Sequence, residues 1–264
     1  MNIFEVIGRA TLRTGAVIWD VMALFFKTLY WLFFAPFKGK FIGRRYIFDQ
    51  MVFAGLQSIL IVFFVTFFIG IVLAMQGAYQ LDKLGAVRFV ASLISVSISR
   101  EIGPVLVALV VAGRVGAAIA AELGTMKVTE QIEALDTMAL NPVRFLVVPR
   151  FLALLLMLPA LTIIGDVAGM FGGFVVGAFN LKISPNLYIS TNFQFLVMKD
   201  VMTGLFKSFV FAMIIAMIAC YHGLNTSGGA EGVGRSTTLS VVSSFILIIL
   251  ADAILTGIFY FSSV

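Results

Sequence analysis

The chain of 264 residues is 61% hydrophobic and only 12% charged, with a formal net charge of +5, whereas an ordinary soluble domain has roughly 25% charged residues. Several apolar runs are long enough to cross a hydrocarbon layer of about 30 Å, so the sequence predicts an all-α integral membrane protein of one domain, residues 1–264. The single cysteine, Cys220, excludes an internal disulfide, and the single histidine, His222, argues against a histidine metal site. The basic residues flank apolar runs, so the positive charge indicates membrane topology and no nucleic-acid partner.

Residues 1–35 are apolar and aromatic but carry one charged stripe. Its members would share one side of a helix: Glu5, Arg9, Arg13, Asp20 and Lys27. This pattern predicts an amphipathic helix in the membrane interface, and the alternative is a first membrane span. No basic start or small-residue cleavage site marks a signal peptide. Pro36 ends the helix, and a basic hinge follows: Lys38, Lys40, Arg44 and Arg45.

Five later apolar stretches predict transmembrane helices. They cover residues 50–78, 89–121, 150–180, 201–222 and 237–262. The second stretch is interrupted by Arg100-Glu101 and Gly103-Pro104. A loop or short surface helix is expected over residues 181–200, which contain Pro185 and several polar residues.

A polar segment, residues 122–141, separates the second and third predicted spans. Apolar residues recur there at helical spacing: Val128, Ile132, Leu135 and Ala139. Glu130, Glu133 and Asp136 would lie on the other face, and Asn141-Pro142 would end the helix. Each charge would cost roughly 2.5–3.5 kcal/mol in hydrocarbon, so we expect a short amphipathic helix in water or against another protein.

Lysine and arginine residues predict the orientation of the chain. Most of them lie in the N-terminal region, in and beside the 122–141 segment, and before the fifth span. Those regions are therefore expected to be cytoplasmic, as is the N-terminus, and the C-terminus to be periplasmic.

Small residues at every fourth position predict close helix packing. The third span carries Gly165, Gly169, Gly173 and Gly177, and the second carries two stripes, Gly113-Ala117-Ala121 and Gly116-Ala120-Gly124. Such stripes let helix backbones approach closely in lipid. The favoured interpretation is packing within the chain, and the alternative is a homodimer seam.

Five charged residues fall inside the predicted spans: Arg100, Glu101, Asp166, Lys207 and Asp252. A charge in the membrane must face a partner or a water-filled cavity. Arg100 and Glu101 are adjacent on a helix and cannot face one partner squarely, so one of them is expected to meet Lys207 or Asp252. An ion-pair network that holds the helices together and a proton relay are the alternatives.

The segment Gly229–Ser236 nearly matches the phosphate-binding pattern G-x-x-x-x-G-K-[ST]. Arg235 replaces the lysine, and the segment follows a predicted span instead of a strand. We therefore expect glycine joints in a cytoplasmic loop and no nucleotide site there.

Two stretches carry a resemblance to a known family. Residues 100–150 read REIGPVLVALVVAGRVGAAIAAELGTMKVTEQIEALDTMALNPVRFLVVPR, and residues 228–244 read GGAEGVGRSTTLSVVSS. Both closely resemble signature regions of the MlaE family of ABC-transporter permeases. The core from Glu122 to Gln131 is far more specific than a glycine pattern, and the resemblance covers nearly the whole chain in span order.

The resemblance implies a non-catalytic permease of the bacterial inner membrane that works as a homodimer. It implies cytoplasmic ABC ATPase subunits, which would hold ATP and Mg²⁺, so no cofactor is expected in this chain. A periplasmic ring of MCE-domain lipid-binding proteins and a small cytoplasmic accessory subunit are further expected partners. The 122–141 helix would be the coupling helix that contacts the ATPase, through Glu130, Glu133, Asp136 and Met138.

The resemblance also implies a phospholipid pocket between two permease copies. It would be bordered by Leu73, Gln76, Arg100, Glu101, Ile102 and Lys207. Arg100 and Lys207 would meet a phosphate, Glu101 would balance their charge, and Leu73 and Ile102 would touch acyl chains. The expected function is passage of phospholipid between the inner membrane and the periplasmic carrier, which would maintain outer-membrane lipid asymmetry. A proton-coupled transporter that uses Glu101, Asp166 and Asp252, and a passive scaffold for the lipid-binding ring, are the rival interpretations.

Overall fold

The computed structural model describes residues 3–34 and 43–261, which form helices and no strand. Lys38 and Lys40 of the basic hinge lie outside the described residues. So do the side chains of Glu5, Arg9, Arg13 and Arg44. In the described part of the chain, six helical stretches are long and apolar enough to cross a membrane. This composition confirms the prediction of an all-α integral membrane protein.

The elements follow the predicted order. The first spanning stretch is α2 (Arg44–Ala54), η2 (Leu56–Ser58) and α3 (Ile59–Asp82). The second begins at η3 (Val87–Phe89) and continues through α4 (Val90–Ser97), η4 (Ile98–Ile102), α5 (Gly103–Val111), η5 (Ala112–Gly116) and α6 (Ala117–Val128). After α7 (Gln131–Thr137) come η6 (Val143–Val147), α8 (Val148–Phe179), α9 (Pro185–Phe195), α10 (Met198–Leu224) and α11 (Gly229–Phe261).

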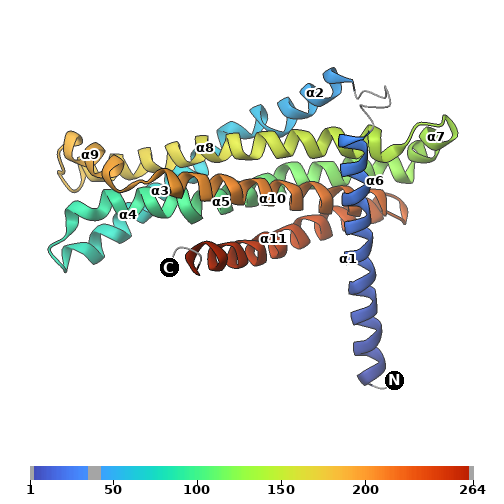
Figure 1. The fold of residues 1–264 in the computed structure, drawn as a ribbon, viewed down its shortest axis with the longest axis horizontal. Coiled ribbons are helices and arrows are strands. Elements are labelled where there is room, and N and C mark those ends of the chain that lie inside the picture. Colours follow the sequence, from blue (N-terminus) through green and yellow to red (C-terminus); the bar gives the residue numbers. More distant parts are fainter. Residues whose placement is uncertain (1–2, 35–42, 262–264) are drawn as a thin grey trace.

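The N-terminal helix α1 (Ile3–Phe33) lies across the other long helices, near the end of the bundle that carries α7 (Figure 1). Leu24 and Thr28 are buried, and Phe25 packs edge to face on Phe151 of α8, with ring centroids 6.2 Å apart. Asp20 and Lys27 are exposed. By length and composition α1 could cross a membrane, but a helix that lies across its neighbours cannot share their membrane axis. The arrangement therefore favours the interfacial interpretation.

The single helix predicted over residues 122–141 is corrected by the structure. Residues 122–128 prolong α6, and α7 is a separate helix of seven residues. Glu130 breaks the helix because its backbone is left-handed, with φ of 58°. Ile132 is buried and Leu135 packs on the core as expected, but Val128 and Ala139 are exposed.

The glycine stripe on α8 packs within the chain. A Cβ atom on Gly70 of α3 would lie 1.9 Å from the carbonyl oxygen of Gly169, and one on Gly172 would lie 2.1 Å from that of Phe67. The backbones of α3 and α8 therefore touch, which confirms the favoured interpretation for this stripe. Gly177 instead makes room for the ring of Tyr188 from α9, and Gly173 makes room for the Tyr188 hydroxyl and the Ile94 side chain.

Replacing Gly70 with alanine is expected to lower the free energy of unfolding by about 1–3 kcal/mol, because the methyl group overlaps backbone that cannot move aside. Gly77→Ala on the same helix is the matched control, since its methyl would meet only the Leu93 side chain at 3.4 Å. The control is expected to be neutral or stabilising, because alanine favours helix. Thermal unfolding in detergent measures both, and equal midpoints would contradict the packing argument.

Candidate functional site

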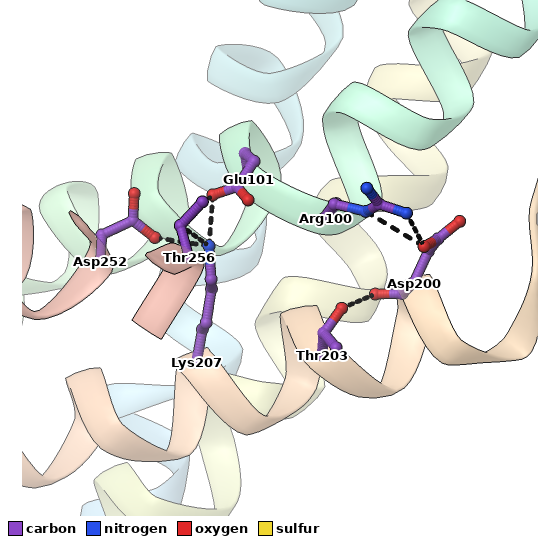
Figure 2. Close-up of polar contacts among 7 residues, drawn as sticks. All are labelled: Arg100, Glu101, Asp200, Thr203, Lys207, Asp252 and Thr256. Carbon is purple, nitrogen blue, oxygen red and sulfur yellow. Dashed lines mark hydrogen bonds and ion pairs between the residues drawn. The ribbon is translucent and has the colours of Figure 1, made fainter. Parts of the chain in front are cut away.

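A charged cavity of about 360 Å³ lies where η4, α10 and α11 meet. It is lined by Val96, Ser97, Arg100, Glu101, Lys199, Asp200, Thr203, Lys207, Thr256 and Phe259. Three stretches that are far apart in the sequence thus supply one site. Figure 2 shows Arg100 and Glu101 approaching from one helix while their partners come from the two others.

The wide turn η4 aims Arg100 and Glu101 at different partners. Residues Ile98–Ile102 form a π-helical turn, in which one extra residue enters the helix. Pro104 has no N–H to donate to the carbonyl of Arg100, so an ordinary α-helical hydrogen bond cannot form there. Short π segments inside α-helices are frequent at functional sites.

Lys207 is the centre of the first polar cluster. Its side chain is only 1% exposed. Its ammonium group donates to Glu101, lies 2.8 Å from Oδ1 of Asp252, and donates to Oγ1 of Thr256 at 2.7 Å. Thr256 in turn donates to Oε2 of Glu101 at 3.1 Å. The ammonium group thus has two hydrogen-bond acceptors and a second carboxylate at ion-pair distance.

Arg100 forms the second cluster with Asp200 of α10. Its Nε donates to Oδ1 of Asp200 at 3.1 Å, and Nη2 makes an ion pair with the same oxygen. Asp200 lies in the first turn of α10, where a helix N-terminus favours negative charge. The Arg100 side chain is 49% exposed while that of Asp200 is 5% exposed.

Arg100 is half exposed whereas Lys207 is buried, and this difference changes the roles expected of the two cations. A solute in the cavity can reach Arg100 and the exposed Lys199, whereas Lys207 is covered and paired with two carboxylates. Lys207 is therefore the ionic link between η4, α10 and α11. Its expected contact with a phosphate stays a prediction.

The other residues of the expected pocket lie elsewhere in the chain. Leu73 and Gln76 border a different cavity, of about 560 Å³, together with Tyr79 and Leu93. Ile102 is partly buried and lines neither cavity. A single copy therefore brings together Arg100, Glu101 and Lys207 but leaves Leu73 and Gln76 apart from them.

The expected coupling residues gather at the far end of the bundle, where α7 projects (Figure 1). All four are exposed: Glu130, Glu133, Asp136 and Met138. Lys127 makes an ion pair with Glu133 across the helix break. The hydrogen bond from Lys127 lowers the pKa of Glu133, so Glu133 stays ionised at neutral pH.

The remaining intramembrane carboxylates do not gather in one place. Asp252 is paired with Lys207, whereas Asp166 lines a separate cavity. A structural ion-pair network is therefore present around Lys207, as one alternative supposed. The segment Gly229–Ser236 is the start of α11 and is helical, so the expectation of glycine joints in a loop was wrong, and no phosphate-binding loop forms there.

Sequence reasoning missed Asp200 and Thr256. Asp200 was assigned to the loop before the fourth span, although an acidic residue at the start of an apolar helix is a signal for the partner of an intramembrane arginine. Thr256 follows Asp252 by one helical turn and so shares its face.

The long apolar helices, the paired charges within them and the exposed acidic helix at one end are the features of a multi-pass membrane permease. The chain belongs to the MlaE permease family, since residues 47–258 match the family model described as Permease MlaE. A probable ABC transporter permease protein of Rickettsia typhi is 40% identical over 98% of both chains. One of Synechocystis is 42% identical over 83% of each chain. The chloroplastic protein TRIGALACTOSYLDIACYLGLYCEROL 1 of Arabidopsis thaliana is 36% identical over 84% of this chain and 63% of its own length.

Proposed function

We propose that this chain is the permease subunit of an ATP-driven phospholipid transporter and works as a homodimer in the bacterial inner membrane. The observation that carries the proposal is the cavity in which the exposed Arg100 lies beside the apolar side chains of Val96 and Phe259. A phospholipid has both matching parts, because its phosphate suits the guanidinium fork and its acyl chains suit the apolar wall.

The energy for transport would come from cytoplasmic ATPase subunits, which would hold ATP and Mg²⁺. The exposed acidic residues on and beside α7 are the proposed contact, since acidic side chains suit a basic groove and set the orientation of docking. On this assignment the N-terminus is cytoplasmic and the C-terminus is periplasmic.

The lipid would pass between the inner membrane and a periplasmic ring of MCE-domain proteins, and this traffic would maintain outer-membrane lipid asymmetry. A small cytoplasmic accessory subunit completes the proposed assembly. Lipid as the substrate class also agrees with the name of the chloroplast relative, which refers to a glycolipid.

The second spanning stretch connects α7 directly to the charged cavity at η4 and could carry a movement between them. Residues 90–128 are helical without a break from α4 to α6, and α7 follows after two residues. ATP binding would shift α7 and move α6 with it, and the wide turns η5 and η4 are the points where the helix can adjust. Arg100 and Glu101 lie on η4, so the movement would alter the charged cavity. ATP drives this change only through different affinities for the two states.

Changing Glu130 and Glu133 together to lysine tests the coupling assignment. The variant is expected to lose the co-purifying ATPase and ATP-dependent lipid transport while the permease stays folded, because the reversed charges repel a basic groove. The control Asp82→Lys reverses an acidic charge at the C-terminal end of α3, outside α7. It should leave both ATPase binding and lipid transport intact. Full recovery of the ATPase with the double variant would contradict the assignment.

Native purification followed by mass spectrometry tests the proposal as a whole. We expect two permease copies, an ATPase and bound phospholipid in one particle. Transport that persists without ATP under a pH gradient would instead support the proton-coupled alternative. Lipid traffic that tolerates apolar replacements of Arg100 and Lys207 would support the scaffold.

A further inference from the structure

We propose that a second cavity, formed by η4, α8, α9 and α10, binds a neutral lipid whose head group carries hydroxyls. The cavity has a volume of about 500 Å³, within the range of about 300–1,000 Å³ that is usual for small-molecule sites. Its apolar lining includes Ile163, Met170, Phe171, Phe174 and Leu196. This site is distinct from the charged cavity and goes beyond the proposed function.

Unpartnered polar atoms identify the cavity as a binding site. Oγ of Ser99, Oδ1 of Asp166, Oη of Tyr188 and Oδ1 of Asn192 all belong to lining residues, and none of these atoms has a hydrogen-bond partner among the described residues. Ser99 is 0% exposed, Tyr188 is 1% exposed and Asp166 is 7% exposed. Buried polar groups in proteins are nearly always paired, so four unpaired atoms around one cavity indicate a ligand that pairs them.

The fold holds two of these groups in place. Gly173 and Gly177 of α8 make room for Tyr188, since a Cβ atom on Gly177 would lie 2.4 Å from the ring. Phe174 packs edge to face on the same ring at 5.5 Å between centroids. A Cβ atom on Gly103 would lie 1.9 Å from Oδ1 of Asp166, so this glycine makes room for the carboxyl group. These groups are packed into position and cannot simply turn toward water.

The chemistry of the lining selects the head group. The lining contains no lysine or arginine that could pair with a phosphate. A hydroxyl both donates and accepts, so a glycerol head can give a proton to Asp166 or Asn192 and accept one from Tyr188 or Ser99. One acyl chain then fills the apolar part. A monoacylglycerol has both a head group with hydroxyls and one acyl chain. A diacylglycerol also offers a hydroxyl beside its acyl chains.

The two cavities share one structural element. Ser99 lines the neutral cavity and Arg100 lines the charged one, and both lie on η4. The backbone oxygen of Ser99 is also packed against α10, since a Cβ atom on Gly204 would lie 2.1 Å from it. Occupancy of the neutral cavity would therefore fix the position of η4, on which Arg100 and Glu101 depend.

Binding of radiolabelled 1-monopalmitoylglycerol to the full chain, purified in detergent with its native partners, tests the proposal. We expect saturable binding of one molecule per chain. Tyr188→Phe and Ser99→Ala should each weaken it about five- to tenfold, because each removes one hydrogen bond to the ligand. Tyr46→Phe removes an exposed tyrosine hydroxyl outside the cavity and is the matched control.

Thermal unfolding without added lipid separates binding from folding. Tyr188→Phe should leave the midpoint unchanged or raise it, because its hydroxyl has no protein partner to lose. Arg100→Gln should slow phospholipid transport but still bind monopalmitoylglycerol saturably, so failure of this site and failure of the phospholipid site are distinguishable. Unchanged affinity in both cavity variants, or equal competition by palmitoyl lysophosphatidate, would overturn the proposal.

Discussion

Replacing Lys207 with methionine is expected to lower the free energy of unfolding by about 3–5 kcal/mol, the usual cost of removing one partner from a buried ion pair. Lys207 is 1% exposed and makes ion pairs with both Glu101 and Asp252. Without it, two partly buried carboxylates from different helices would lie close together with no cation between them. Removing the ammonium group would thus turn an attraction among η4, α10 and α11 into a repulsion.

A rescue variant separates the effect of the lost charge at position 207 from the effect of the changed side-chain shape. Lys207→Met combined with Glu101→Gln and Asp252→Asn should recover much of the lost stability, since no uncompensated charge remains. Lys182→Met, at an exposed position outside the cavity, is the control and should change the midpoint little. Thermal unfolding in detergent measures all four proteins. If Lys207→Met alone were as stable as the wild type, the cluster would not hold η4, α10 and α11 together.

The pairing of the buried charges could be predicted in part from the sequence. Charges in apolar spans must find partners, which led to the expectation that Arg100 or Glu101 meets Lys207 or Asp252. Glu101 meets Lys207, and Lys207 also meets Asp252. The partner of Arg100 escaped prediction because Asp200 lies at the boundary of a loop, and element boundaries are the least certain part of a sequence prediction.

Two backbone features could not be predicted from the sequence. Left-handed residues at helix ends are usually glycine or asparagine, so nothing marked Glu130 as the break between α6 and α7. The interruption at Arg100-Glu101 and Gly103-Pro104 marked the place of η4, but it did not show that the helix widens there by one residue. The neutral cavity was equally hidden, because it depends on Tyr188 from the loop region entering the glycine-lined face of α8.

The second large effect is expected for transport of anionic phospholipid, which Arg100→Gln should slow by about tenfold or more. Charge-assisted hydrogen bonds contribute about 1.5–3 kcal/mol each, and Arg100 is the half-exposed cation of the cavity. The transport rate of Arg100→Lys should fall between those of the wild type and Arg100→Gln, because an ammonium group keeps the charge but loses the bidentate geometry. ATP-dependent lipid transfer in reconstituted vesicles measures the rates. Arg88→Gln, an exposed arginine before α4, is the control.

Loss of transport alone would not distinguish a lipid ligand from a structural role, because Arg100→Gln also leaves Asp200 without its cation. The double variant Arg100→Gln with Asp200→Asn removes that difficulty, since two neutral amides leave no charge unpaired. It should unfold at the wild-type midpoint and still transport slowly. If it instead transported at the wild-type rate, Arg100 would serve only to neutralise Asp200, and the charged cavity would be an ion-pair network that holds η4 on α10.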